Sequence, residues 1–235
     1  MKIKEPGSGG STYDNSALRN KEYSTKFSYQ KLLSAFLGPG PITLIDIGAR
    51  YGESTNWFAE HFDIAMAHLF EPNPFTKTVI SKKIKNFEIY KLALSDFDGS
   101  QFFNVHELNG MSSLENLNLS SKDSISYLTN HKVSKVNIPV KTLDSLNIKY
   151  PDLVKIDVQS SEVKVIKGGQ KTLSQSKVIM VEVSLYDLYE VSSTIGAIEN
   201  LLPNHFLYSI PFISYNSMNL RTDWVELFFV SNSYK

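Results

Sequence analysis

The chain has 235 residues, 42% of them hydrophobic and 20% charged, which suits a single α/β domain with additions and a sizeable core. Its 24 basic and 24 acidic side chains give a formal net charge of +0, so it lacks the electrostatic footprint of a protein whose main partner is nucleic acid. The absence of cysteine excludes disulfides, zinc–thiolate sites and thiol nucleophiles.

Residues 1–20 are polar and contain a run of glycine and serine, which predicts a flexible lead-in to one domain over 21–235. No apolar run typical of a signal peptide follows the first charges, and no stretch reaches the roughly 20 apolar residues that cross a bilayer. We therefore expect a cytoplasmic protein without a membrane span. Apolar spacing over 16–37 indicates a helix, assigned to 21–40 of the domain and stopped by the Gly-Pro-Gly-Pro run at 38–41.

From residue 42 onward, short apolar strands alternate with helical stretches. Strands that are apolar on both faces and separated by helices are typical of a parallel sheet with helices on both sides. The last two strands follow each other without a helix, which predicts an antiparallel hairpin at the sheet edge. The predicted strands cover 42–47, 64–70, 87–94, 152–158, 178–184, 205–210 and 225–230. The predicted helices cover 53–62, a segment from the turn at Pro72 and Pro74 to residue 84, 161–173 with an end near Gly168 and Gly169, and 194–202.

Residues 100–140 break this alternation. Strands are predicted at 101–105 and 135–140, with a polar segment rich in asparagine and serine between them. We interpret this part as a β-rich insertion between the third and fourth strands, over one end of the sheet, where substrate loops usually lie.

The segment from Asp46 to Gly52 joins the first strand to the next helix. Gly48 and Gly52 would let backbone N–H groups at the helix N-terminus approach a ligand closely. A dinucleotide-binding turn would read Gly-x-Gly-x-x-Gly, whereas here the middle glycine is missing and Asp46 precedes the first one. A carboxylate there would repel pyrophosphate but suits a ligand with a sulfonium and an ammonium group. The open alternative is that Asp46 caps the helix and the glycines relieve strain.

Two further candidate positions lie at the ends of the second and third strands. Glu71 ends the second strand, where an acid can hold a ribose diol by paired hydrogen bonds. The alternative interpretation of Glu71 is an exposed acid before a proline turn. Residues 92–96 end the third strand and are placed to contact adenine, although Asp96 can equally be a turn residue.

These features, in this order, make the segment from about 42 to 184 resemble the FkbM-type methyltransferase family. The motifs are IDIGARYGEST (45–55), LFEPNP (69–74), LALSDFDG (92–99), GMSSL (110–114), VKTLDSL (140–146) and DLVKIDVQSSEVKVIKGGQKTL (152–173). The resemblance implies a Rossmann-like methyltransferase fold with a mostly parallel seven-stranded sheet. It also implies methyl transfer from S-adenosylmethionine, usually to a hydroxyl of a sugar, glycan or secondary metabolite. The cofactor-binding residues expected from it are Asp46, Gly48, Ala49, Gly52, Glu71, Pro72, Asn73, Ala93, Leu94, Ser95 and Asp157.

One motif departs from the family's pattern. Members typically carry Asp-x-Glu-Gly-x-Glu after the fourth strand. This chain keeps Asp157 and Glu162 but has Gln159 in place of the first glutamate and Ser160 in place of the glycine. The fold assignment is unaffected, whereas the acceptor and the activity depend on these two replacements.

Ionisable residues gather at the ends of the fourth and fifth strands. Because side chains alternate along a strand, Lys155 and Asp157 share one face, and the family's strand order brings Glu182 close to Lys155. Buried charges are costly unless paired, so such a cluster often marks an active site. The alternative is a self-contained Lys155–Glu182 ion pair. We take Asp157 and Glu162 as candidate catalytic residues and Lys155 and Glu182 as pocket residues; Glu162 could equally be a favourable acid at a helix N-terminus.

Methyl transfer to oxygen requires alignment of the acceptor and removal of its proton. His106 and His131, in the insertion, are candidate bases, with an ordinary surface position as the alternative for each. Ser112 and Ser113 are candidate pocket residues. No second acid adjoins Asp157, so we expect no metal ion.

Three functions stay open at this stage. The first is an O-methyltransferase acting on a small molecule or glycan. The second is a non-catalytic module that keeps the cofactor pocket, which Gln159 and Ser160 motivate. The third, least favoured, is an NAD-dependent oxidoreductase on a similar fold. We expect no nucleic-acid partner, and a homo-oligomer is compatible with the sequence.

Overall fold

The computed structural model describes residues 28–107, 109–120, 132–185, 188–215 and 220–235. The predicted lead-in at 1–20 lies outside the described residues, as does the first part of the predicted N-terminal helix. The described part of that helix is α2 (Tyr29–Leu37). It begins after Ser28, whose Oγ accepts a hydrogen bond from the Lys31 N–H at 3.3 Å, so a serine N-cap sets its start.

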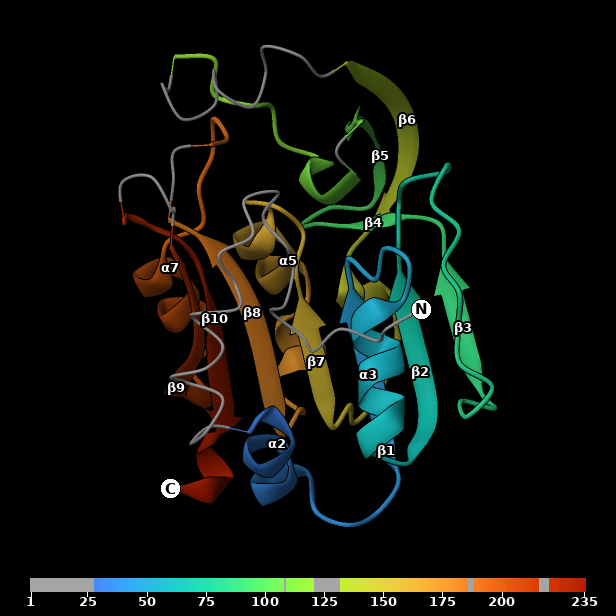
Figure 1. The fold of residues 1–235 in the computed structure, drawn as a ribbon, viewed down its shortest axis with the longest axis vertical. Coiled ribbons are helices and arrows are strands. Elements are labelled where there is room, and N and C mark those ends of the chain that lie inside the picture. Colours follow the sequence, from blue (N-terminus) through green and yellow to red (C-terminus); the bar gives the residue numbers. More distant parts are fainter. Residues whose placement is uncertain (1–27, 108, 121–131, 186–187, 216–219) are drawn as a thin grey trace.

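The predicted seven-stranded sheet is confirmed (Figure 1). Its order is β3-β2-β1-β7-β8-β10-β9, with parallel pairing from β3 to β8 and antiparallel pairing of β10 with β8 and β9. The predicted antiparallel edge hairpin is therefore also confirmed. The strands are β1 (Ile42–Ile47), β2 (Ile64–Phe70), β3 (Phe87–Tyr90), β7 (Leu153–Ile156), β8 (Val178–Ser184), β9 (His205–Tyr215) and β10 (Thr222–Ser231).

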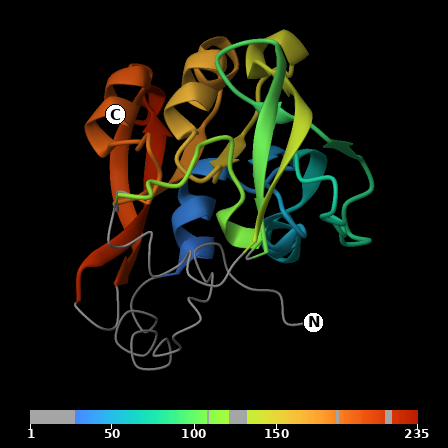
Figure 2. The ribbon, with the colours of Figure 1, turned by 90° about the horizontal axis from the view of Figure 1, so that it is seen from above.

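Helices cover both faces of this sheet, as Figure 2 shows: α2 and α3 (Glu53–His61) on one, and α5 (Glu162–Gly168), α6 (Gln170–Leu173) and α7 (Ile195–Leu201) on the other. Successive residues of a strand point to opposite faces, so Leu44 packs with α2 and α3 while Ile45 packs with α5 and α7. This is why the central strands are apolar on both faces. Among the described residues, no helix is long and apolar enough to cross a membrane.

A smaller sheet stands beyond the carboxyl ends of the central strands (Figure 1). It contains β4 (Ala93–Leu94), β5 (Gly99–His106) and β6 (Val133–Lys141), in the order β4-β6-β5. The two strands predicted in the insertion are thus present and slightly longer than expected. Short 3-10 turns are η1 (Asn109–Met111), η2 (Leu143–Leu146) and η3 (Asn232–Tyr234).

The predicted continuous strand over 87–94 is wrong. The chain leaves the large sheet after Tyr90 and joins the small one at Ala93, which pairs with Val140. Ser95 N donates to Lys141 O at 2.9 Å, so the β6 backbone captures the end of the segment. One apolar run therefore serves two sheets, which its hydrophobicity alone does not reveal.

The predicted helix from Pro74 to residue 84 is also wrong: the segment is irregular. It is rich in β-branched residues, which fit a helix less well than an extended chain. Its backbone groups find partners elsewhere. Val79 N donates to Tyr51 O at 3.1 Å, and Asn56 accepts from Ser81 N at 2.7 Å and donates to Val79 O at 2.8 Å. Tertiary hydrogen bonds thus replace the helical ones.

The helix predicted over 161–173 is two helices, α5 and α6, separated at Gly169. A Cβ atom on Gly168 would lie 2.0 Å from Ser95 O, so α5 ends against the backbone that follows β4. The Asp144 carboxylate then accepts hydrogen bonds from the N–H groups of Lys171 and Thr172 at 3.0 and 2.8 Å. These bonds satisfy the free N–H groups at the start of α6 and so favour a new helix there.

Candidate active site

The turn after β1 is shaped by a close backbone contact. Gly48 has a φ of +87°, and a Cβ atom there would lie 1.8 Å from Asp157 O, at the end of β7. The N–H groups of Gly48 and Ala49 both donate to Phe70 O, at 2.9 and 3.0 Å. Glycine is therefore required so that β1 and β7 can converge, and these two N–H groups are used within the protein rather than left to face a ligand.

Gly52 starts α3 with a left-handed backbone, φ +87°. A Cβ atom there would lie 2.8 Å from Val79 O, in the irregular segment that replaces the predicted helix. The glycine thus allows that segment to close over the start of α3. Both glycines of the motif are explained by backbone geometry, which the sequence pattern alone could not distinguish from ligand approach.

Asp46 is fully buried near the end of β1. Its Oδ2 accepts a hydrogen bond from Thr55 Oγ1 at 2.6 Å, and its Oδ1 has no hydrogen-bond partner within the described ranges. Burial raises the pKa of this carboxyl, and the neighbouring Lys155 opposes the shift. Asp46 is not the N-cap of α3, because Gly52 occupies that position. A buried oxygen without a donor is costly, so it is suited to a ligand that supplies one.

Glu71, directly after β2, is buried, so the alternative of an exposed acid before a proline turn does not hold. Its two oxygens each accept one backbone N–H, from Arg50 and from Asn73, both at 2.8 Å. Burial raises its pKa, and these two N–H donors oppose the shift. The donors fix the carboxylate while leaving each oxygen able to accept another hydrogen bond. Pro72, between Glu71 and Asn73, helps to fix this turn.

The residues predicted to contact adenine, Ala93, Leu94 and Ser95, are all buried at the junction of the two sheets. Ser95 O lies against Gly168, and Ser95 Oγ donates to Asp96 Oδ1 at 3.2 Å. These contacts explain the local packing of the segment. A role in binding a cofactor stays a prediction.

Lys155 lies in a buried row of acids that crosses the large sheet. It is directly opposite Asp46 in the β1–β7 pair, and its Nζ contacts Asp157 Oδ2 at 3.0 Å. Burial lowers the pKa of Lys155, but the carboxylates of Asp157, Asp46 and Glu182 raise it by more than burial lowers it. The pKa of Lys155 therefore lies above its ordinary value, and Lys155 is held as a cation. The predicted shared face of Lys155 and Asp157 is confirmed by this contact. The partner of Lys155 in an ion pair is Asp157 rather than Glu182.

Glu182 and Glu226 face each other across the β8–β10 pair. Burial, reinforced by Asp157, raises the pKa of Glu182 well above its ordinary value. Burial also raises the pKa of Glu226 to about 7, although Lys155 lowers it. Glu226 Oε2 accepts from Tyr29 Oη at 2.8 Å, whereas its Oε1 has no hydrogen-bond partner in the part of the chain that the structure describes.

Sequence reasoning missed Glu226. The available signal was a single acid inside the apolar strand WVELFFV, where an unpaired charge is costly.

The turn between β7 and α5 carries the departure from the family motif. Gln159 and Ser160 both have left-handed backbones, with φ of 56° and 76°. Glu162, in the first turn of α5, accepts at Oε1 from Ser160 N at 3.0 Å and Val158 N at 3.3 Å. Burial raises the pKa of Glu162 to about 7. The acid is thus both a local cap and a group that can exchange a proton near neutral pH.

The insertion reaches this turn through Ser113, whose Oγ donates to Gln159 O at 2.6 Å. Ser112 lies one step further away, and its Oγ accepts from His106 N at 3.1 Å. His106 is buried at the end of β5, so the surface alternative does not hold for it; its role as a base stays a prediction. His131 lies outside the described residues.

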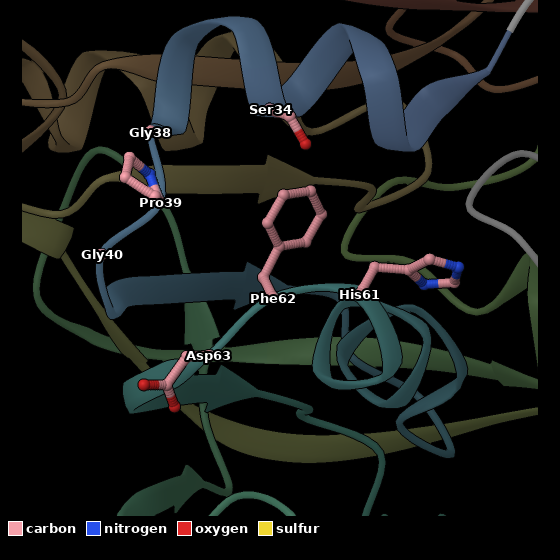
Figure 3. Close-up of a pocket in the computed structure, with 7 residues that line it drawn as sticks. All are labelled: Ser34, Gly38, Pro39, Gly40, His61, Phe62 and Asp63. Atoms are coloured by element: carbon pink, nitrogen blue, oxygen red, sulfur yellow. The ribbon is translucent and has the colours of Figure 1, made fainter.

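A separate pocket of about 360 Å³ lies at the opposite, amino edge of the strands. Figure 3 shows it between the ends of α2 and α3, lined by Ser34, Gly38, Pro39, Gly40, His61, Phe62 and Asp63. None of the predicted site residues lines it. In open α/β sheets ligands bind outside the carboxyl ends of the strands. The acids around Lys155, which we call the acidic cluster (Asp46, Asp157, Glu162, Glu182 and Glu226), lie at that end.

Comparison with known proteins bears on this arrangement. The family model described as the methyltransferase FkbM domain matches residues 46–210 of this chain. The matched segment begins at Asp46 and includes every acid of the cluster except Glu226. The chain belongs to this family. A similar protein is the 2-O-methyltransferase NoeI of Sinorhizobium fredii. It is 26% identical over 187 residues, which cover 75% of this chain and 76% of NoeI.

Solved structures similar to this FkbM methyltransferase domain include an FkbM methyltransferase from Methylobacillus flagellatus, with a TM-score of 0.47 and 12% identity. That match covers 80% of this chain and 43% of the other, so the chain spans less than half of that protein. Another is the magnesium protoporphyrin IX methyltransferase ChlM of Synechocystis, with a TM-score of 0.43, 14% identity and coverage of 95% and 86%.

Proposed function

We propose that this FkbM-family chain is an S-adenosylmethionine-dependent O-methyltransferase that acts on a hydroxyl of a sugar, glycan or secondary metabolite. The observation that carries the proposal is the excess of buried carboxyl groups around one cation, Lys155, with Asp46 Oδ1 left without a donor. Burial of so many acids is costly, and a positively charged ligand would offset that cost.

The residues present fit this cofactor at two points. Asp46 would accept a hydrogen bond from a cationic group at the carboxyl end of β1, since its Oδ1 is buried and lacks a partner. Glu71 would accept hydrogen bonds from ribose hydroxyls, since the N–H groups of Arg50 and Asn73 fix its carboxylate and leave further lone pairs. An anionic dinucleotide would instead meet the repulsion of the acidic cluster, which disfavours the NAD-dependent alternative.

When bound, S-adenosylmethionine supplies a methyl group on a positively charged sulfur. The tasks of the protein are to align the acceptor hydroxyl and to take its proton. Asp157 is one quarter exposed and is oriented by donors on both oxygens, Lys155 on Oδ2 and Gln159 on Oδ1. Glu162, with a pKa raised by burial to about 7, is the second candidate base. Ser113, Lys155 and Glu182 would form the floor of the acceptor pocket beside them.

The choice of a hydroxyl acceptor is supported by NoeI, whose name describes a 2-O-methyltransferase. Transfer to oxygen also suits a site rich in carboxylates, because a hydroxyl must lose its proton to a base. The non-catalytic alternative rests on Gln159 and Ser160. It would keep cofactor binding without turnover.

Calorimetry with S-adenosylmethionine on the full chain tests the cofactor assignment. Asp46→Asn removes one charge without changing shape, and we expect it to weaken binding about tenfold or more, since hydrogen bonds to charged groups are worth about 1.5–3 kcal/mol. Asp63→Asn, at the amino edge of the sheet, is the matched control and should bind as the wild type does. Equal affinity in Asp46→Asn and the wild type would contradict the site assignment.

Transfer of a labelled methyl group to hydroxylated small molecules and glycans separates the remaining functions. Incorporation of label supports the enzyme. Cofactor binding without incorporation across such acceptors supports the non-catalytic module, and micromolar NAD binding in place of S-adenosylmethionine would support the oxidoreductase.

A further inference from the structure

Gln159 is held in a strained backbone conformation at the end of β7. Both Gln159 and Ser160 have left-handed φ angles, which non-glycine residues adopt at a cost. The turn is held by three partners: Ser113 Oγ donates to Gln159 O at 2.6 Å, Ser193 Oγ donates to Ser160 O at 3.3 Å, and Ser160 N donates to Glu162. Strain that several contacts maintain often reflects the placement of a functional side chain.

The side chain placed by this turn is the amide of Gln159. Its Nε2 donates to Asp157 Oδ1 at 2.9 Å and lies 3.4 Å from Glu182 Oε1. On the other side, Tyr189 Oη donates to Met111 O at 2.9 Å and lies 3.4 Å from Gln159 Oε1. The two acceptors, Asp157 and Glu182, determine the orientation of the amide, with its nitrogen towards the acids.

The neutral amide of Gln159 donates to both acids without adding charge, unlike the glutamate that the family motif typically carries at this position. The acids Asp157 and Glu182 approach the same amide nitrogen, and a carboxylate in its place would repel both. An apolar side chain would leave Asp157 Oδ1 without its donor. The charged and titratable groups that act on Asp157 or on its neighbours from the surrounding elements are Asp46, Lys155, Glu162, Glu182, Tyr189 and Glu226.

We propose that Gln159 is a positioning residue of the active site: its uncharged amide bridges Asp157 and Glu182 and fixes the Asp157 carboxylate at the cofactor edge of the sheet. The proposal rests on the proposed function for its role in catalysis. The bridge itself is a property of the folded chain and can be tested without any ligand.

The first test compares unfolding by urea at pH 5 and pH 8. Gln159→Glu introduces a carboxyl group of nearly the same shape, which stays protonated between Asp157 and Glu182 in the folded chain but ionises in the unfolded one. Relative to the wild type, we expect its folding equilibrium constant to fall at least tenfold between the two pH values, which corresponds to a rise of about 1.5 or more in the pKa of the new carboxyl on folding. Gln175→Glu makes the same change where the Gln175 side chain is hydrogen-bonded to the backbone of Lys171 and Tyr150, and should run parallel to the wild type.

The second test measures the affinity for S-adenosylmethionine by calorimetry, under conditions where urea titration shows each variant to be folded. Gln159→Leu removes the donor without adding charge, and we expect about tenfold weaker binding, since Asp157 loses one of the two groups that orient it. Gln175→Leu is the control and should bind as the wild type does.

The two tests fail in different ways. If Gln159→Glu follows the wild type at both pH values and Gln159→Leu binds S-adenosylmethionine with wild-type affinity, the positioning role is overturned. If the wild type binds no S-adenosylmethionine while Gln159→Glu shows the pH-dependent loss, the bridge is supported and the proposed function is overturned.

Discussion

Substitution of Gly48 by alanine tests whether the convergence of β1 and β7 depends on this residue. A Cβ atom at this position would lie 1.8 Å from Asp157 O, and both atoms belong to backbone segments that have no rotamer to change. Relief requires the two strand ends to separate by more than about 1 Å before ordinary van der Waals contact is restored.

The cost can be estimated from three contributions. The left-handed backbone of Gly48 costs an alanine about 1–2 kcal/mol. Overpacking in a well-packed interior costs about 1–3 kcal/mol. Separation of the strands also weakens the hydrogen bonds from Asp157 N to Ile47 O and from Gly48 N to Phe70 O, both 2.9 Å, each worth about 1 kcal/mol. We therefore expect Gly48→Ala to lower the free energy of unfolding by about 4 kcal/mol.

Urea denaturation of three variants separates these contributions. Gly38→Ala has a positive φ of 74° but open space around the new Cβ, so it reports the backbone cost alone. Gly40→Ala has open space and no positive φ, so it should lie within about 1 kcal/mol of the wild type. A Gly48→Ala variant that is no less stable than Gly38→Ala would mean that the contact with Asp157 imposes no cost, and so would contradict the predicted dependence on Gly48.

Three further predictions concern the acidic cluster and its turn. Ser160→Gly should stabilise the chain by about 0.5–1 kcal/mol in urea denaturation, since glycine adopts a φ of 76° without strain; a loss of stability would contradict this. The pKa of Glu162 is raised to about 7 in the folded chain, so the unfolded chain ionises first. Stability therefore falls by about 3 kcal/mol as pH rises from 4.5, the ordinary pKa of a glutamate, to 7, and Glu162→Gln should remove this part of the pH dependence of the urea midpoint. Tyr29→Phe removes the hydroxyl that donates to buried Glu226 and should lower the free energy of unfolding by about 1–3 kcal/mol. The loss should be larger at pH 8 than at pH 6, because the ionised carboxylate of Glu226 needs the donor most. An equal loss at both pH values would argue against an ionisable partner.

Much of the fold followed from local patterns in the sequence. Apolar runs of strand length separated by helical stretches predicted the seven-stranded, mostly parallel sheet and its antiparallel edge, because the central strands are buried on both faces. The pattern of Asp46, Glu71 and Asp157 predicted acids at the ends of neighbouring strands. These three acids do lie at neighbouring strand ends, because β2, β1 and β7 pair in parallel and the carboxyl ends of parallel strands meet at one edge.

Tertiary structure decided what local patterns could not. The helix predicted after Pro74 does not form because Asn56 and Tyr51 supply its backbone partners, and strand 87–94 divides because β6 captures Ala93 and Leu94. Glu226 joins the cluster only through the β8–β10 pairing.

Gly48 and Gly52, in the motif IDIGARYGEST, show the same contrast between local pattern and tertiary contact. The glycines in the sequence indicated a tight turn after β1, since glycine there signals unusual backbone geometry. Only the folded chain showed that Gly48 is needed because Asp157 O occupies the space of a side chain, and that Gly52 makes room for Val79 O. Contacts between residues distant in sequence depend on how the strands are ordered and paired, which no local pattern encodes.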